Sequence, residues 1–285
     1  SWAGTAAAGI EDFLVEEGGR LGEVYGYKTD GFYTADDFTF DAEKGTYALK
    51  AGVNDCSSLI GGKVYPGSIK LKANEDGEYK KERLGNTVPI VSGGFGLNAR
   101  WKGFDFTAFF NYSLGNKIVN ATKLGSSFYS GSSKNWNIND HFTSANRYSW
   151  IDPSTGTNLL SSASIKANGE AWTINRLNEV NTGSSIWNPA AATVMPLVDW
   201  AVEDGSFLRV NNITIGYTLP KLFVSKLNIQ NIRIYVTGYN LHCFTKYSGT
   251  DPEVDCCTST PMTPGIDYAA YPKSRSFVGG INVTF

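Results

Sequence analysis

Segments of about ten residues in which apolar and polar side chains alternate recur along this chain, and they constrain its fold more than any other feature. In an extended strand, the last ten residues, SFVGGINVTF, place on one face Phe277, Ile281, Val283 and Phe285. Residues 92–101, SGGFGLNARW, alternate in the same way. Strict alternation is typical of a β-strand with one apolar and one polar face. The sequence therefore predicts a sheet whose two faces differ.

The alternating segments also contain the signals of strand ends. Lys102-Gly103 separates two alternating runs and suits the positive φ angles of a tight hairpin turn. The run 207–219 stops at Pro220, which cannot donate a ladder hydrogen bond. Its apolar residues change phase near Asn211-Asn212, which indicates a bulge. With the run 231–247, the terminal strand and a weaker strand near residues 10–18, we predict six strands.

The connections between these strands are of two kinds. Those after Trp101 and Leu219 are short, whereas long ones span roughly residues 20–90, 114–206 and 246–275. Loops of that length are unusual in a compact soluble domain. Short turns at one rim and long loops at the other are typical of an outer-membrane β-barrel. In that arrangement the chain ends at the short-turn, periplasmic rim.

Composition argues against some classes of protein and leaves others open. Charged residues make up 18% of the chain, below the roughly 25% of soluble domains. No apolar run of about 18 residues exists that could form a membrane-spanning helix. The net charge of −2 gives no electrostatic reason to expect binding to nucleic acid. A soluble carbohydrate-binding β-sandwich remains an alternative, since its strands alternate too.

Five blocks of the sequence resemble the SusC-type (SusC/RagA) family of TonB-dependent outer-membrane transporters. In chain order they are GEVYGYKTDGFY, PIVSGGFGLNARWKGFDFTAFFNYSLGNKI, SFLRVNNITIGYTLP, GYNLHCFTKYSGTDPEV and GIDYAAYPKSRSFVGGINVTF. The segment between about residues 120 and 205 matches the family poorly. The resemblance implies that residues 1–285 form the C-terminal portion, about the last six strands, of an all-β, antiparallel, roughly 22-stranded barrel with a plug.

The same resemblance implies a function and several partners. Family members import oligosaccharides or peptides across the outer membrane of Gram-negative bacteria, together with a SusD-like lid lipoprotein on the cell surface. TonB acts through an N-terminal part that this chain lacks, so the plug and the earlier strands are expected as partners. The sequence does not show whether the substrate is a glycan or a peptide, and it does not show the oligomeric state of the complex. In such families the terminal aromatic, here Phe285, is a signal for barrel assembly.

Motifs for catalysis or cofactors were not found, so we predict neither an enzyme nor a cofactor. The sequence lacks GxSxG, P-loop and HExxH patterns. His141 and His242 are interpreted as ordinary histidines. Residues 72–82 resemble a family calcium loop, but Lys72 stands at the first ligand position, where an ammonium group repels Ca²⁺. We therefore predict no metal there.

The remaining candidates lie in the long loops. Loop tryptophans could stack on sugars or pack against the lid, although packing within the loops is an equal alternative; they are Trp136, Trp150, Trp172 and Trp187. Four cysteines are compatible with free thiols or with one disulfide, and spacing does not decide between them; they are Cys56, Cys243, Cys256 and Cys257.

Overall fold

The computed structural model describes residues 12–129, 138–224, 229–253, 263–268 and 270–285. They divide into two compact units, each with buried residues of its own. The unit that we call the sheet unit comprises residues 17–22, 85–119 and 203–285 within those ranges. The unit that we call the loop unit comprises residues 12–16, 23–84 and 120–202, with the same gaps.

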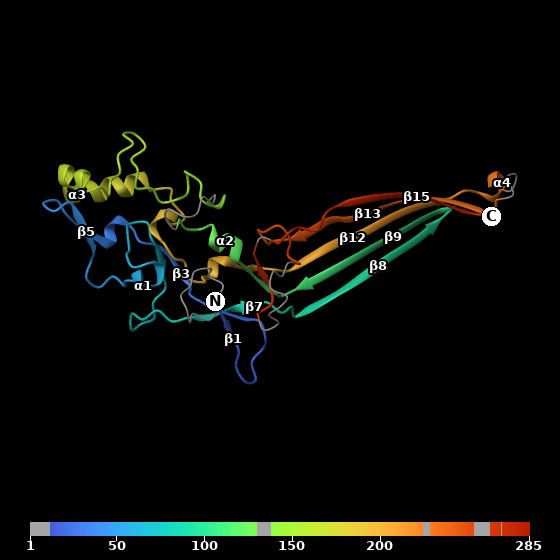
Figure 1. Ribbon diagram of the computed structural model, residues 1–285, viewed down its shortest axis with the longest axis horizontal. Coiled ribbons are helices and arrows are strands. Elements are labelled where there is room, and N and C mark those ends of the chain that lie inside the picture. The colour runs from blue at the N-terminus through green and yellow to red at the C-terminus, as the bar shows by residue number, and fades with distance from the viewer. Residues whose placement is uncertain (1–11, 130–137, 225–228, 254–262, 269) are drawn as a thin grey trace. The chain divides into compact units, whose positions relative to one another are not determined.

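The sheet unit is built on a five-stranded sheet in the order β15-β13-β12-β9-β8 (Figure 1). All neighbouring strands are antiparallel. The strands are β8 Val91–Trp101, β9 Phe104–Leu114, β12 Phe207–Thr218, β13 Asn231–Thr245 and β15 Ser276–Thr284. These are the five strongly alternating segments of the sequence, so that part of the prediction is confirmed.

Local signals set the register of this sheet as predicted. Lys102 and Gly103 have φ angles of 47° and 92°, and they join Trp101 directly to Phe104. Two successive positive φ angles match the twist of the flanking strands in a type I′ hairpin. The register of β12 against both neighbours shifts between Val210 and Asn212, which is the predicted bulge.

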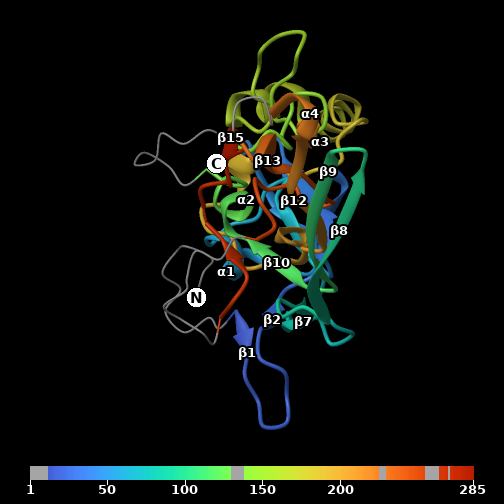
Figure 2. The same ribbon diagram turned by 90° about the vertical axis from the view of Figure 1, so that its right-hand side faces the viewer.

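The sixth predicted strand lies outside the five-stranded sheet. Of the described residues 12–18, only Phe13–Leu14 form a strand, β1, and it pairs with β2 Glu23–Gly26. Strand β7, Glu82–Asn86, completes that three-stranded sheet (Figure 2). Another small sheet has the order β11-β10-β14, formed by Val202–Asp204, Lys117–Asn120 and Ile266–Asp267. The described sheet therefore has five long strands, and a count of six is not confirmed.

The loop unit is a folded body assembled from two of the predicted long loops. Two-stranded sheets pair β3 with β6 and β4 with β5, which are Thr29–Phe32, Ile69–Leu71, Phe38–Asp41 and Thr46–Leu49. Its helices are η1 Ala35–Asp37, α1 Ser57–Ile60, α2 Ala121–Gly125, α3 Ser162–Val180, η3 Pro189–Ala191 and η4 Asp199–Ala201. Fully buried side chains from both segments, such as Ile69, Leu71, Leu177 and Leu197, form its core.

The helix α3 corrects the predicted all-β class to mostly β with a few helices. It has 19 residues and is interrupted at Gly169, whose φ of 77° is not helical. Only two of its apolar residues, Ile165 and Leu177, are buried, so the sequence carries no apolar stripe that would have indicated a helix. Among the described residues no helix, including the short α4 Lys221–Val224, has the length and hydrophobicity to cross a membrane.

Candidate functional site: a two-faced sheet and a loop unit

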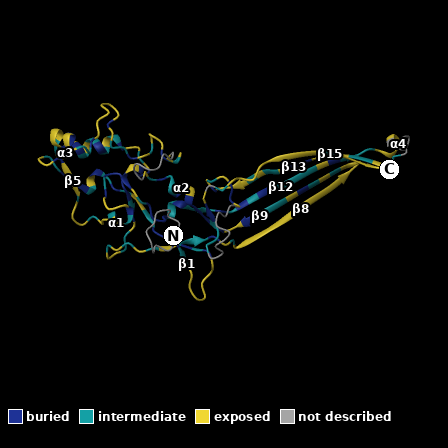
Figure 3. Ribbon diagram, in the orientation of Figure 1, coloured by how far each residue is buried: buried dark blue, intermediate teal, exposed yellow. Residues whose placement is uncertain are grey.

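One face of the five-stranded sheet is apolar and exposed along all five strands. The register aligns Leu97 with Ala108 and Ile213, and Phe106 with Ile215 and Val236. Ile234 in turn lies opposite Ile281. Trp101, Ile215, Phe277 and Ile281 are 68%, 55%, 70% and 65% exposed, and Figure 3 shows the outer strands of the sheet as exposed. Contiguous exposed apolar surfaces of this kind mark sites that contact another protein or a membrane.

Aromatic side chains lie in two rows on the apolar face. Near the end of the sheet that carries the Lys102-Gly103 turn, which we call the turn end, the rings of Phe104 and Tyr217 have centroids 4.5 Å apart. Toward the opposite end, the loop end, Phe95 and Phe110 are stacked at 4.9 Å. Aromatic side chains near both ends of an apolar face are typical of barrel strands at the two interfaces of a membrane.

The other face of the sheet is polar and its groups are paired across strands. Thr107 donates to Asn98 at 3.0 Å, and the hydroxyl oxygens of Thr214 and Thr237 lie 2.8 Å apart. Nearer the turn end, Arg233 on β13 binds the Asp105 carboxylate on β9 with two hydrogen bonds of 2.9 and 2.5 Å. The alternation of the sequence thus places apolar side chains on one face of the sheet and polar side chains on the other.

The Asp105–Arg233 pair crosses the intervening strand β12 at Gly216. A Cβ atom on Gly216 would lie 2.5 Å from Asp105 Oδ1 and 2.6 Å from Arg233 Nη2. Contacts that short require the end of the Asp105 or Arg233 side chain to shift, so glycine leaves room for the pair in its present geometry. No local pattern indicates this function of Gly216, because Asp105 lies far from it in the chain.

A second charge cluster joins Asp251, Glu253 and Lys273, which follow β13, to the loop end of the sheet. Arg209 on β12 donates to Glu253 at 2.6 Å and to Asp251 at 2.5 Å. Lys273 adds a 2.7 Å bond to Glu253, and Asn111 donates to the same carboxylate at 3.1 Å. Two cations and two carboxylates balance, as burial of the Arg209 and Asp251 side chains requires. Sequence reasoning missed this cluster.

Both outer strands of the sheet have an open edge. Within the described residues β8 pairs only with β9, and β15 pairs only with β13. The outward N–H and C=O groups of β8 and β15 therefore lack ladder partners in this sheet. Long, exposed edges of this kind pair readily with further strands.

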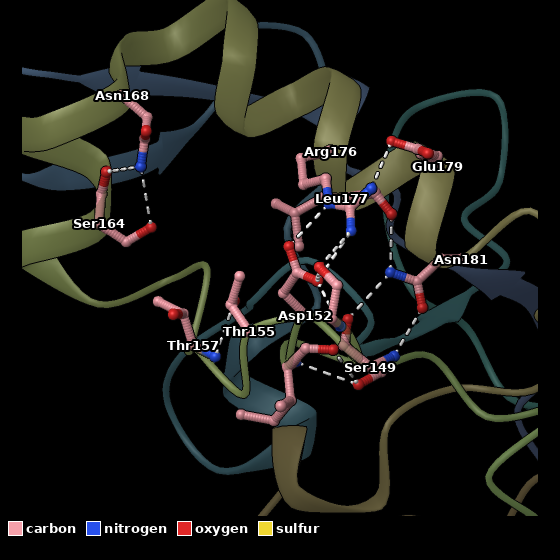
Figure 4. A network of polar contacts seen from close by, with 12 residues as sticks. Ser149, Asp152, Thr155, Thr157, Ser164, Asn168, Arg176, Leu177, Glu179 and Asn181 are labelled. Carbon is pink, nitrogen blue, oxygen red and sulfur yellow. Dashed lines mark hydrogen bonds and ion pairs between the residues drawn. The ribbon is translucent and has the colours of Figure 1, made fainter.

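The loop unit is held together by polar networks as well as by its core. Arg176 on α3 donates to Asp152 at 2.7 and 2.8 Å and to Glu179 at 2.7 Å (Figure 4). Hydrogen bonds from the Arg176 guanidinium, and then from Ser154, hold the pKa of the Asp152 carboxyl well below its usual range. The Glu170 carboxylate accepts the backbone N–H of Phe40 at 2.9 Å, which joins α3 to β4.

The four candidate tryptophans differ in their environments. Trp150 donates its ring N–H to the Pro66 carbonyl at 2.6 Å. Trp187 is buried and donates to the Ser127 carbonyl at 3.2 Å. Trp172, on α3, is 43% exposed. Trp136 lies outside the described residues. Their proposed contact with substrate or lid stays a prediction.

The other candidate residues are placed as follows. Phe285 follows β15 and is 80% exposed. In the loop 72–82, the side-chain oxygen of Asn74 accepts the backbone N–H groups of Asp76 and Glu78, at 3.1 and 2.8 Å. In the described ranges no group of three or more His, Cys, Asp or Glu is placed to hold a metal. The absence of calcium stays a prediction.

The histidines and cysteines have ordinary surroundings. His141 Nδ1 lies 2.5 Å from Asn139 Oδ1, and His242 packs edge-on against Phe244. Cys56 is buried and Cys243 half-buried, and both are free thiols. Burial raises the pKa of the Cys56 thiol. The predicted candidates Cys256 and Cys257 lie outside the described residues.

Comparisons with known proteins agree on one kind of relative. No family model matches the chain. It is 30% identical over 277 residues to TonB-dependent receptor P3 of Formosa agariphila, which covers 95% of this chain and 23% of the receptor. It is 34% identical over 89 residues to TonB-dependent receptor SusC of Bacteroides thetaiotaomicron, 30% of this chain and 8% of the receptor.

A solved structure has a similar fold. The RagAB peptide importer in its open-open state matches with a TM-score of 0.53 and 19% identity, over 99% of this chain and 25% of that chain. The chain thus spans about a quarter of the length of the relatives that it matches most fully. At this identity the structural likeness concerns the fold alone.

Proposed function

Because this chain is homologous to TonB-dependent receptors of the SusC type, we propose that it forms the C-terminal part of the barrel wall of an active importer in the outer membrane of a Gram-negative bacterium. The proposal covers the whole of residues 1–285. In it, the five-stranded sheet faces lipid with one side and the lumen with the other.

The observation that carries this proposal is the exposed apolar face opposite a paired polar face. In a bilayer, apolar side chains such as Ile215 and Ile281 contact acyl chains, and the two aromatic rows lie near the interfaces. The Asp105–Arg233 pair then lies in the lumen, where water and further polar groups are available. A membrane therefore supplies the apolar surroundings that the sheet lacks by itself.

The open edges of β8 and β15 support a larger, closed barrel. Every backbone polar group within a bilayer needs a hydrogen-bond partner, and five strands cannot close into a barrel. The remainder of the transporter would supply the other strands, to a total of about 22, and the plug. The outer edges of β8 and β15 would each pair with a further strand of that wall.

Strand direction assigns the two ends of the sheet to the two sides of the membrane. The Lys102-Gly103 turn, the connection 219–230 and Phe285 share the turn end, which we assign to the periplasm. The connections 114–206 and 246–275 join the strands at the loop end, which we assign to the cell surface. A SusD-like lid lipoprotein would contact that side, and TonB would act through the remainder of the transporter.

The proposed cargo is an oligosaccharide or a peptide. RagAB, whose structure is similar, is a peptide importer. The loop unit, with the exposed Trp172, would belong to the surface that meets cargo or lid. The proposed activity needs no enzyme chemistry from this chain.

The alternative, a soluble carbohydrate-binding β-sandwich, needs a second sheet packed on the apolar face. Exposure of that face on all five described strands favours the membrane over the sandwich. The decisive experiment is fractionation of cells that express the whole transporter, followed by purification in mild detergent. We expect an outer-membrane protein with a lipoprotein subunit, and crosslinks from the lipoprotein to residues 20–90, 114–206 and 246–275. Extraction without detergent, or crosslinks concentrated on the short turns, would contradict the proposal.

A further inference from the structure

Asn168-Gly169 is the only Asn-Gly dipeptide of the sequence, and it lies inside the helix α3. Gly169 interrupts that helix, because its φ of 77° and ψ of 176° fall in a region that essentially only glycine adopts. The interruption divides α3 into a first segment, residues 162–168, and a second segment, residues 170–180. An unusual backbone conformation and this dipeptide therefore coincide at one point of the loop unit.

The surroundings of the dipeptide are open. Asn168 is exposed, and a Cβ atom on Gly169 would meet no atom of the described residues within 4 Å. The side-chain amide of Asn168 donates to the carbonyl oxygen of Ser164 at 2.8 Å, which holds it against its own turn of the first segment (Figure 4). The carbonyl oxygen of Gly169 belongs to the second segment, where it accepts the Thr173 hydroxyl at 2.7 Å.

An asparagine that precedes glycine can lose its side-chain amide without an enzyme. The backbone nitrogen of the glycine attacks the side-chain carbonyl carbon, Cγ, a succinimide ring forms, and ammonia leaves. Water then opens the ring to aspartate or to isoaspartate, in which the main chain runs through the side-chain carbon. Glycine favours the reaction because it has no side chain to hinder the attack. A regular helix disfavours it, because each interior N–H is fixed in a hydrogen bond to a carbonyl of the preceding turn.

We propose that Asn168 is a site of spontaneous deamidation, at which the backbone nitrogen of Gly169 attacks Cγ of Asn168. The bond between these two atoms forms, the bond from Cγ to Nδ2 breaks, and Nδ2 leaves as ammonia with the proton of the Gly169 amide. Hydrolysis of the ring consumes water, so the reaction needs no oxidant, reductant or metal. The interruption of α3 favours the attack, since the regular helix ends at the residue that supplies the nitrogen. The reaction goes beyond the proposed function and does not depend on it, because it needs only this dipeptide and water.

Isoaspartate at position 168 changes how α3 is attached to the hairpin of β4 and β5. The first segment contacts the hairpin through Ser162, whose hydroxyl donates to the Lys44 carbonyl at 3.5 Å. The second segment contacts it through Glu170, whose carboxylate accepts the Phe40 N–H at 2.9 Å. Isoaspartate adds a carbon atom to the main chain between these contacts, so we expect at least one of them to weaken. Aspartate at the same position leaves the length of the main chain unchanged.

The test is peptide mapping of the whole detergent-purified transporter after incubation at neutral and at mildly alkaline pH. Peptic digestion at low pH, which adds little deamidation of its own, precedes mass spectrometry, and isoaspartyl methyltransferase labels the isoaspartate. We expect the acid forms to accumulate at position 168, and faster at alkaline pH, because the attacking nitrogen must first lose its proton. The control within the same molecule is Asn175, which is exposed on the second segment and precedes Arg176; we expect it to stay an amide.

The matched variant is Asn168→Gln, which keeps the amide and Gly169 but has to close a larger ring that forms more slowly. We expect no conversion in this variant over the time in which the wild type converts. Conversion of Asn168 no greater than that of Asn175 in the folded transporter would overturn the inference, whether or not unfolding in urea accelerates it.

Limited proteolysis measures the consequence for α3. We expect the loop unit to be cleaved faster in incubated than in fresh wild-type protein, and at equal rates in incubated and fresh Asn168→Gln. Freshly purified Asn168→Asp has the charge of the product without the additional main-chain carbon, so we expect it to be cleaved like the fresh wild type. Equal cleavage of incubated and fresh wild-type protein would contradict the loosening of α3. Outer-membrane fractionation tests the proposed function separately, since deamidation does not require a membrane.

Discussion

Ile215→Arg tests the assignment of the apolar face to lipid. Ile215 is 55% exposed and lies in register between Phe106 and Val236. Along β9, Phe104 belongs to one aromatic row and Phe110 to the other, so Thr107 marks the midpoint between the rows. Phe106, and with it Ile215, is one residue from that midpoint, or about 3.4 Å along the strand.

The depth of Ile215 sets the expected magnitude. Arginine on the lipid face of a barrel costs about 2–4 kcal/mol at the midplane and about 0–1 kcal/mol near the interfaces. Because the proposed barrel places Ile215 close to the midplane, we expect the full cost of about 2–4 kcal/mol. The matched control is Thr214→Arg, one residue away on the polar face. It removes the hydrogen bond with Thr237 and should cost about 0.5–1.5 kcal/mol.

The assay compares the two variants in the whole transporter. The amount of heat-modifiable protein in the outer membrane reports assembly, and urea unfolding in lipid vesicles reports the free energy of unfolding. We expect a clear loss for Ile215→Arg and near-normal behaviour for Thr214→Arg. Equal damage in both variants, or greater damage in Thr214→Arg, would refute the assignment of the two faces.

Four further predictions follow from single residues. Deletion of Phe285 should lower the amount of transporter in the outer membrane without changing uptake per molecule; immunoblotting with an uptake assay checks this, and normal surface levels would contradict it. Gly216→Ala should cost on the order of 1 kcal/mol of unfolding free energy, because the ends of the Asp105 and Arg233 side chains must shift; an unchanged midpoint in urea unfolding would contradict this. The Asp152 carboxyl has a folded pKa below its ordinary 3.8, so the stability that it contributes is present above that value and is lost as the pH falls below about 4; pepsin cleavage of the loop unit should rise there in the wild type and depend less on pH in Asp152→Asn. Added Ca²⁺ should leave the unfolding midpoint unchanged, because the loop 72–82 lacks its first ligand, and calorimetry that detects binding to that loop would oppose this.

The local pattern of the sequence was sufficient for the strands of the sheet, because each signal lies within a few residues. Alternation with a period of two fixes which side chains share a face. The Lys102-Gly103 turn fixed the register of β8 and β9, and the phase change near Asn211 located the bulge. The resemblance to SusC-type transporters predicted the family of the relatives that the comparisons identify. These inferences needed no knowledge of which segments meet.

Only the tertiary structure decided the features that join distant residues. Asp105 and Arg233 are 128 residues apart, and Arg209 and Asp251 are 42 apart. Nothing in the sequence around them indicates pairing, because a charged residue on a polar face is ordinary by itself. The loop unit also depends on contacts between distant residues, since the Glu170 carboxylate accepts the backbone N–H of Phe40, 130 residues away. Its helix α3 is stabilised by such contacts and not by an apolar stripe, so the sequence by itself predicted loops there.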